Sequence, residues 1–410
     1  MRSLSTRGCL KHLLIAFGLL LAVVAFAVIR EWDTVSLMLD NMTAMGEGGP
    51  VAQDIRYPKD LVDYIAEHPE SVSLVAFDVG APDEGIYVQA DRSRALASVP
   101  RLMLLAEYAR RVEWNRWDSE ARVPIDSIAA FALPGTGARQ HRRAVAALDE
   151  AGRIGADSSI TLASVARAAI RHNDDAAADW LIDRMGRRAV ETIPEWTGLV
   201  DSDPPLPSSG VYLSWSHHAD TTAADMRLER YRTMPDSVYA GRVHALAHRL
   251  RADVRFRQRE EERRTQRGSQ LGLRQQRRFA QVTHPRGDAA EYARLMARVA
   301  TDSSGAFRRM RSFVERPITS DSVEVSITAV GSKGGATPGI ISFVGYAQRR
   351  EAPPRVMALF MDDVPIGVFY HLLQTGLDKG FQLRLLGDDA FFEDVRRRLH
   401  EARRAAISIR

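Results

Sequence analysis

The sequence Ala97-Ser98-Val99-Pro100-Arg101, followed by the apolar run over residues 102–109, decides how the rest of the chain is interpreted. Ser98 precedes a proline by two residues, at the start of a segment with apolar side chains at helical spacing, which is typical of an N-cap. We therefore expect Ser98 at the N-terminus of a buried helix. There, free backbone N–H groups and the helix dipole favour a developing negative charge. Arg101 follows one turn later on the same face.

Length and composition indicate an ordinary globular chain of two or three structural units. It has 410 residues, 45% of them hydrophobic, which is enough for a sizeable core. The formal net charge is +4, but residues 249–278 carry eleven arginines and four acidic residues. The single cysteine, Cys9, excludes a disulfide scaffold and a cysteine-ligated zinc site. We expect no metal and no organic cofactor.

The N-terminal sequence predicts export. Residues 1–11 carry three cations and resemble a cytosolic tail, and residues 12–29 are almost entirely apolar. Such a run is at the short edge of a membrane span of roughly 17 to 25 residues, and is long for a secretory signal core of roughly 7 to 15. It is either a signal anchor or a signal peptide with a cleavage site at Ala25-Phe26-Ala27. Both alternatives place the body on the extracytoplasmic, periplasmic side.

Residues 30–70 are interpreted as a linker with an N-terminal helix. The glycine-rich stretch over residues 46–50 indicates that residues 33–54 are irregular, and residues 61–68 fit a short helix. Residues 72–78 and 85–90 alternate as two strands joined by a turn at residues 81–84, so a hairpin leads to Ser98.

The remaining sequence is helical and then mixed. Residues 114–210 are mostly helical, with clear amphipathic helices at residues 161–170 and 175–185. Strands are expected at residues 323–330, 340–347 and 355–361, and two closing helices at about residues 366–377 and 388–404. The predicted fold is α/β of the α+β kind: a five-stranded antiparallel sheet flanked by helices, interrupted by an all-helical lobe.

Three short motifs connect this pattern to a known family. The segments Ser98-Val-Pro-Arg101, Asn173-Asp174-Asp175 and Lys333-Gly334-Gly335, in this order, resemble the Ser-x-x-Lys, Ser-Asp-Asn and Lys-Thr-Gly motifs of class A-like serine β-lactamases and penicillin-binding proteins. The resemblance implies one domain over residues 71–405. Its sheet lobe would comprise residues 71–112 and 284–405, and its helical lobe residues 113–283, with a basic insert at about residues 240–282.

The resemblance also implies roles for particular residues. Ser98 would be the nucleophile, the amides of Ser98 and Ala336 would form the oxyanion hole, and Lys333 would anchor a substrate carboxylate beside Gly334 and Gly335. The substrates would be β-lactams or peptidoglycan-type peptides.

Three positions depart from the family pattern. Arg101 replaces the lysine that acts as a base, and a guanidinium keeps its proton at physiological pH. Asn173 replaces the serine that relays protons, and an amide cannot do so. Asp175 replaces an asparagine, and we expect it to form an ion pair with Arg101. Class A enzymes also place a glutamate in a Glu-x-x-Leu-Asn context on an omega-shaped loop. Residues 186–215 contain Glu191 and Glu195 without that context, so efficient antibiotic turnover is not expected.

Each candidate residue also has a plain structural interpretation. The alternative for Ser98 is a helix cap alone, and the alternative for Lys333 is an ordinary cation at the end of a strand; the three motifs in order favour the functional interpretations. Gly334 and Gly335 permit either close approach of a ligand or a simple turn. His172 is either a substitute base or, as is more common for a histidine in a loop, a surface residue.

The basic insert and the overall function leave alternatives open. The insert is interpreted as a solvated, partly mobile helical excursion, or as a site for anionic lipid or polymer; export argues against nucleic acid. The chain is expected to be a membrane-tethered serine hydrolase that forms an acyl-Ser98 intermediate. The alternative is a catalytically inactive relative that binds a cell-wall peptide or a partner protein.

Overall fold

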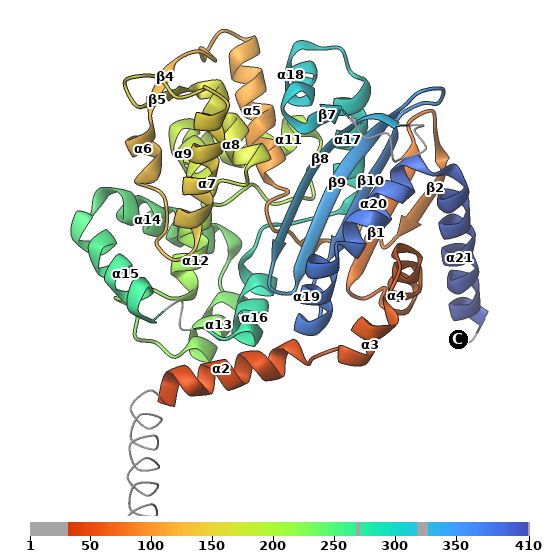
Figure 1. The fold of residues 1–410 in the computed structure, drawn as a ribbon, viewed down its shortest axis with the longest axis horizontal. Helices are drawn as coiled ribbons and strands as arrows, with labels where there is room; N and C mark the ends of the chain where they lie inside the picture. Colours follow the sequence, from red (N-terminus) through yellow and green to blue (C-terminus); the bar gives the residue numbers. More distant parts are fainter. Residues whose placement is uncertain (1–31, 268–270, 318–326, 409–410) are drawn as a thin grey trace, which may run out of the picture.

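The computed structural model describes residues 32–267, 271–317 and 327–408, and its centre is an antiparallel sheet (Figure 1). Among these residues the sheet has six strands in the order β2-β1-β10-β9-β8-β7. Their bounds are β1 (Val72–Asp78), β2 (Ala81–Val88), β7 (Glu315–Pro317), β8 (Ile327–Thr337), β9 (Ile340–Arg349) and β10 (Arg355–Met361).

The predicted fold class is confirmed, with one strand more than expected. The additional strand, β7, has three residues including Pro317 and pairs with Ala329, Val330 and Gly331 of β8. A segment this short shows no alternation of apolar and polar residues, so the sequence does not reveal it. Strand β8 runs through Thr337, so the glycine-rich residues 331–337 are part of the sheet and not a loop.

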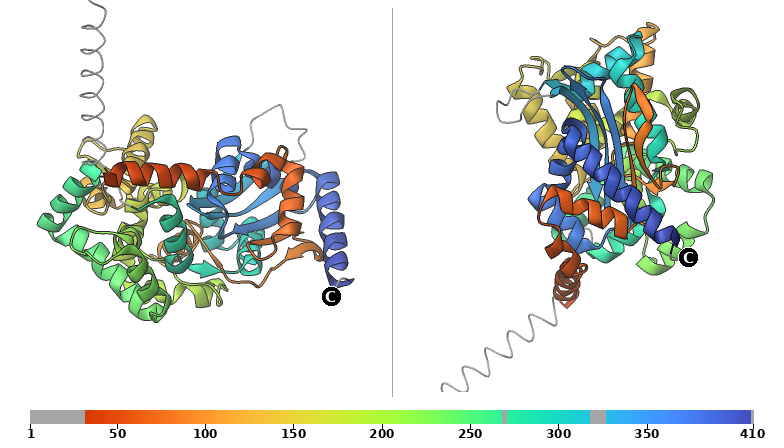
Figure 2. Two further views of the ribbon diagram at one scale, coloured as in Figure 1. Left: turned by 90° about the horizontal axis from the view of Figure 1, so that it is seen from below. Right: turned by 90° about the vertical axis from the view of Figure 1, so that its right-hand side faces the viewer.

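Both faces of the sheet are covered by helices, as Figure 2 shows. In β1, Leu74 and Ala76 pack into the core with α4 (Leu61–Glu67), α19 (Ile366–Thr375), α20 (Leu377–Gly387) and α21 (Asp389–Ser408). The alternate residues Val75 and Phe77 face the larger core, which includes α17 (Ala289–Thr301) and α18 (Gly305–Val314). Buried apolar side chains on both faces keep the sheet in one register. Three helices, not the expected two, follow β10.

The helix after Ser98 is α5 (Arg101–Glu113), and its first nine residues are all buried. The expectation that Ser98 caps this helix is wrong. Pro100 occupies the N-cap position and no side chain caps it, while the Ser98 carbonyl accepts the Arg101 N–H at 3.3 Å. The proline has the φ angle that a helix start requires, so the preceding turn closes through backbone groups and leaves the serine hydroxyl unused.

The helical lobe contains the two amphipathic helices that were expected at residues 161–170 and 175–185. These are α8 (Leu162–Arg171), capped by the Thr161 side chain, and α9 (Asp175–Met185), capped by Asp174. The other elements of the lobe are β4 (Arg122–Pro124), α6 (Ile125–Ala129), α7 (Gly137–Glu150), β5 (Ser159–Thr161), α10 (Arg187–Glu191), α11 (Ile193–Thr197), α12 (Ser208–Trp215), α13 (Ala224–Arg232), α14 (Asp236–Ala252), α15 (Val254–Arg267) and α16 (Leu273–Thr283). Strands β3 (Arg94–Ala95) and β6 (Arg286–Gly287) pair where the lobes meet.

The basic insert is helical and packs one side on the body, while its other side is exposed to solvent. Helices α14 and α15 bury Leu250 and Phe256. The Glu260 carboxylate is fully buried and accepts hydrogen bonds from Arg263 at 3.0 Å and Arg264 at 2.9 Å. Part of the positive charge that the sequence assigns to a surface is therefore neutralised inside the fold.

Residues 33–54 are helical where an irregular linker was expected. Helix α2 (Trp32–Met45) lies along one edge of the molecule beside α16 and α19, and α3 (Gly49–Asp54) follows it (Figures 1 and 2). The expected membrane segment at residues 12–29 lies outside the described residues. Among the residues that are described, no helix has the length and apolar content to cross a bilayer.

Arg94 connects several segments near the sheet edge. Its buried guanidinium donates to Asp362 at 2.8 Å, to the Ser73 hydroxyl at 2.9 Å and to the backbone carbonyl of Val72 at 2.9 Å. These groups lose their hydrogen bonds to water when they are buried, and the hydrogen bonds that they form with one another replace them.

We expect Arg94→Leu to lower the free energy of unfolding by about 3–5 kcal/mol, because it leaves the Asp362 carboxylate buried without its partner. Urea denaturation measures this. Exposed Arg92 is the matched control, and Arg92→Ala should change stability by less than about 0.5 kcal/mol. Equal effects of the two substitutions would contradict the assignment.

Candidate functional site

Ser98 and strand β8 lie in direct contact. A Cβ atom added to Gly335 would lie 2.3 Å from the Ser98 backbone nitrogen, so only glycine permits this approach. Ser98 is partly exposed, and neither its hydroxyl nor its amide hydrogen-bonds to a described residue. The expected convergence of the first and third motifs is therefore present, with the serine free.

Lys333, two residues before Gly335 on β8, is buried and is bound to the second motif. Its Nζ lies 2.5 Å from Asn173 Oδ1 and 2.5 Å from the Gly334 carbonyl oxygen. Asn173 has a φ of 52°, a left-handed conformation that asparagine tolerates better than most residues. Burial and the positive charge of Arg101 hold the pKa of Lys333 well below its usual value.

Arg101 and Asp175 form the ion pair expected from the sequence. Both side chains are largely buried, and Arg101 Nη2 also lies 3.2 Å from the Ser208 hydroxyl. Its Nη1 is buried without a partner among the described residues. Burial acts to lower the pKa of Arg101, but the Asp175 charge and hydrogen bond outweigh it and the pKa is raised. This guanidinium cannot accept a proton from Ser98.

The middle residue of the second motif, Asp174, is structural. It is buried, caps α9 by accepting the Ala176 N–H at 3.0 Å, and lies 2.8 Å from His141 Nδ1. These contacts fix the turn that presents Asn173 and Asp175 on either side of it.

Asp179, one turn after Asp175 on α9, holds the start of α12. It accepts the Ser208 N–H at 2.7 Å and the Ser209 N–H at 2.8 Å. Burial raises the pKa of Asp179 to about 7, against the opposing effect of these hydrogen bonds. The contact places the Ser208 hydroxyl against Arg101.

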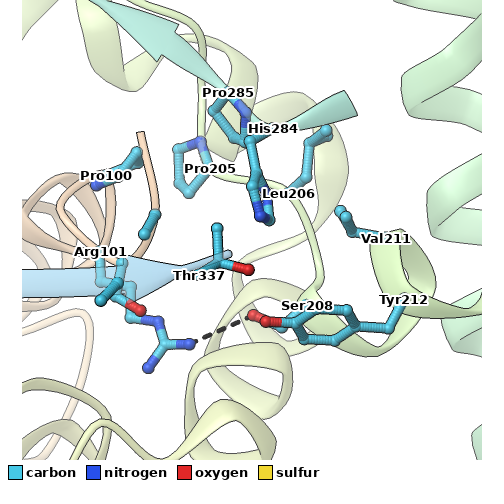
Figure 3. A pocket seen from close by; sticks show the side chains of 13 residues that line it. Pro100, Arg101, Pro205, Leu206, Ser208, Val211, Tyr212, His284, Pro285 and Thr337 are labelled. Atoms are coloured by element: carbon cyan, nitrogen blue, oxygen red, sulfur yellow. Dashed lines mark hydrogen bonds between the residues drawn. The ribbon is translucent and has the colours of Figure 1, made fainter. Parts of the chain in front are cut away.

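A small cavity, shown in Figure 3, has Ser98 among its lining residues. Its volume is about 40 Å³, enough for a few water molecules and far below the 300–1,000 Å³ or so of a drug-sized ligand site. It is lined by Ala97, Ser98, Pro100, Arg101, Pro205, Leu206, Ser208, Val211, Tyr212, His284, Pro285, Ala336 and Thr337. Ser98 and Ala336, the two expected oxyanion donors, share this cavity.

Several lining residues were not expected from the sequence. Pro205, Leu206, Ser208 and Tyr212 come from a stretch without a motif, and residue 284 was expected only as the start of the second part of the sheet lobe. His284 Nε2 has no described partner, and burial, with the charge of Arg101, lowers the pKa of His284 to about 4. His284 is therefore neutral at physiological pH and a weak base. The only signal for these residues is their place between the second and third motifs.

Other candidates lie elsewhere. His172 ends α8 and does not line the cavity, and neither do Glu191 and Glu195. Glu191 instead pairs with Arg187 at 2.6 Å.

Three carboxylates do meet at a separate point, at Asp201, Asp288 and Glu291. Asp288 caps α17, and Glu291 accepts the Asp201 N–H and the Ser202 hydroxyl. Because these local contacts explain the cluster, we assign it no metal.

The sheet, the helical lobe and the serine between them define a protein of the serine β-lactamase and transpeptidase-like class. The model of the β-lactamase enzyme family matches residues 57–370, and the chain belongs to that family. No curated protein matches the chain.

Solved structures that are similar to the chain include three from this class. A β-lactamase from Sphaerobacter thermophilus is 17% identical, with a TM-score of 0.47, and the match covers 79% of this chain and 96% of that one. The β-lactamase of Vibrio parahaemolyticus is 11% identical with a TM-score of 0.48, covering 80% and 97%. The protein PBP-A is 14% identical with a TM-score of 0.45, covering 80% and 95%.

We expect Asp175→Asn to lower the free energy of unfolding by about 3–5 kcal/mol, because it leaves the Arg101 charge buried and unpaired. Arg101→Met combined with Asp175→Asn removes both charges and should cost less than Asp175→Asn alone. A double-mutant cycle in urea measures the coupling. Additive effects within about 0.5 kcal/mol would show that the pair is not coupled.

Proposed function

We propose that this protein is a serine hydrolase that acylates Ser98 with β-lactam or peptidoglycan-type amides. The observation that carries the proposal is the contact of Ser98 with Gly335, beside which Ser98 and Ala336 share a cavity. The serine hydroxyl and amide have no partner among the described residues, and Lys333 is buried on the same strand, two residues before Gly335. A serine in this position is placed to attack a carbonyl whose oxygen is bound by two backbone N–H groups.

Lys333 is the group that we assign as general base. Arg101 is committed to Asp175, and the lowered pKa of Lys333 favours a neutral amine, whose lone pair remains available while two N–H groups donate.

In the proposed reaction the serine oxygen attacks the carbonyl carbon as its proton passes to Lys333, directly or through a water. The proton then moves to the amide nitrogen as the carbon–nitrogen bond breaks, which leaves acyl-Ser98. Water hydrolyses this ester. Because Glu191 and Glu195 lie away from the cavity, we expect the hydrolysis step to be slow and the acylated protein to accumulate.

A second candidate function is binding without catalysis. It is favoured by the Arg101–Asp175 ion pair and by the cavity of only about 40 Å³. In this case the cleft region would bind a cell-wall peptide or a partner protein, and Ser98 would stay unmodified.

We further propose that the chain is anchored in a membrane by residues 12–29 with its body on the extracytoplasmic, periplasmic side. The apolar run and the cations before it support this placement. Exposed arginines of α15, such as Arg255 and Arg259, are then available to anionic lipid or envelope polymer.

Fluorescent penicillin is expected to label the full chain covalently, and Ser98→Ala should abolish the label. Ser93→Ala, at an exposed serine outside the cavity, is the matched control and should keep it. Gel fluorescence and intact-mass spectrometry measure the adduct. Arg101→Lys with Asp175→Asn should raise the labelling rate, because it restores the base and amide of the family motifs.

Absence of an adduct after long incubation would contradict the hydrolase proposal. Retention of the Ser98→Ala protein on isolated peptidoglycan would then support the binding function.

The labelling rate should rise with pH until Lys333 is neutral. Because the pKa of Lys333 is lowered, the plateau should be reached well below the ordinary lysine value of 10.5. Lys333→Arg keeps the positive charge but supplies no base, and should reduce the rate by about 10²–10⁴-fold. A rate that is independent of pH, or unchanged in Lys333→Arg, would remove Lys333 from the mechanism.

A further inference from the structure

Helix α2 presents an uncharged apolar face to solvent. Met38, Leu39, Met42 and Met45 are between 47% and 64% exposed, whereas the other large exposed apolar residues described are scattered over the molecule. Met38, Met42 and Met45 are four and three residues apart, so they lie in one stripe along the helix, with Leu39 beside it.

The opposite face of α2 is fixed to the body. Ala44 is buried, Asp40 pairs with Arg274 at 2.6 Å, and Asn41 accepts the Leu273 N–H at 2.8 Å. Just after the helix, Glu47 pairs with Arg277 at 3.3 Å. The apolar face therefore cannot turn inward while these contacts with α16 hold. Figure 2 shows α2 lying along the surface of the body.

The charged side chain of this part of α2 also lies on the side that faces the body, away from the apolar stripe. Asp40 is the only charged residue between Thr34 and Met45, and its carboxylate is directed at Arg274. The stripe of Met38, Met42 and Met45 thus carries no charged group that would have to lose its hydration in an apolar environment.

Helix α2 directly follows the apolar run that we propose as the membrane anchor, and this position indicates that a bilayer covers its apolar face. The apolar run over residues 12–29 ends two residues before α2 begins. If that run enters a bilayer, α2 starts within a few ångströms of its surface. The family model begins at residue 57, so α2 lies outside the residues that it matches.

We propose that α2 lies in the plane of the membrane interface, with Met38, Leu39, Met42 and Met45 among the acyl chains. An interfacial helix buries such a face about 5–10 Å into the boundary of headgroups and chains. This inference rests on the anchoring proposed above and adds to it. The body is held against the membrane in one orientation by α16 and α19, and is not suspended on a flexible tether.

Spin labels on the full chain test the proposal. Cys9→Ser removes the single cysteine, and Met38→Cys, Met42→Cys and Met45→Cys are then labelled one at a time in vesicles of phosphatidylethanolamine and phosphatidylglycerol. Val238→Cys, 55% exposed on α14, is the aqueous control. Ser36→Cys and Thr43→Cys, exposed at the side of α2, test the helical periodicity.

The expected result is a ratio of oxygen collisions to nickel-chelate collisions severalfold higher at positions 38, 42 and 45 than at 238, with lower values at 36 and 43. Nickel-accessible labels at 38, 42 and 45 in protein that floats with the vesicles would overturn this inference and leave the anchor standing. Protein that does not float would overturn both. Spin–spin broadening between chains would assign the face to a second copy instead.

Discussion

A guanidinium buried beside the serine is the constraint on which the chemistry of this site depends. Arg101 is the first residue of α5, where the helix is already enclosed, and it has to be neutralised locally. Asp175 at the start of α9 does this, and Ser208 adds a hydrogen bond. The position next to Ser98, the proposed nucleophile, is therefore occupied by a group that keeps its proton, and any proton acceptor has to come from another element.

The strand that supplies Lys333 is held in place independently of that ion pair. Gly335 permits the backbone of β8 to lie against Ser98, and the strand is fixed by β9 along its length. The backbone geometry of a nucleophile site can thus be maintained while the side chains that move protons are exchanged. Lys333 has the Asn173 amide as a partner, and among the residues that the structure describes no carboxylate hydrogen-bonds to it. Such an environment disfavours the charged amine.

The features that could be predicted from the sequence are those that depend on residues close together in the chain. Helix α9 matched its expected bounds because its cap, Asp174, and its apolar stripe are both short-range features. The Arg101–Asp175 pair was expected because a buried cation needs a counter-charge. Helix α2 was missed because its apolar residues lie partly on the solvent side, which weakens the pattern of a helix packed on a core. The cavity walls at Leu206 and His284 depend on tertiary placement, which no local pattern encodes.

One wall of the cavity beside Ser98 is formed by a segment that takes no part in the Arg101–Asp175 ion pair. The segment that bears Pro205 and Leu206 is fixed at both ends. On one side Asp203 accepts the Arg286 N–H at 2.8 Å and donates its own N–H to the Arg286 carbonyl at 2.7 Å. On the other side Asp179 binds the first two amides of α12. Prolines at positions 204, 205 and 207 restrict the backbone between these points. The backbone that forms this side of the cavity is therefore held by contacts at both of its ends.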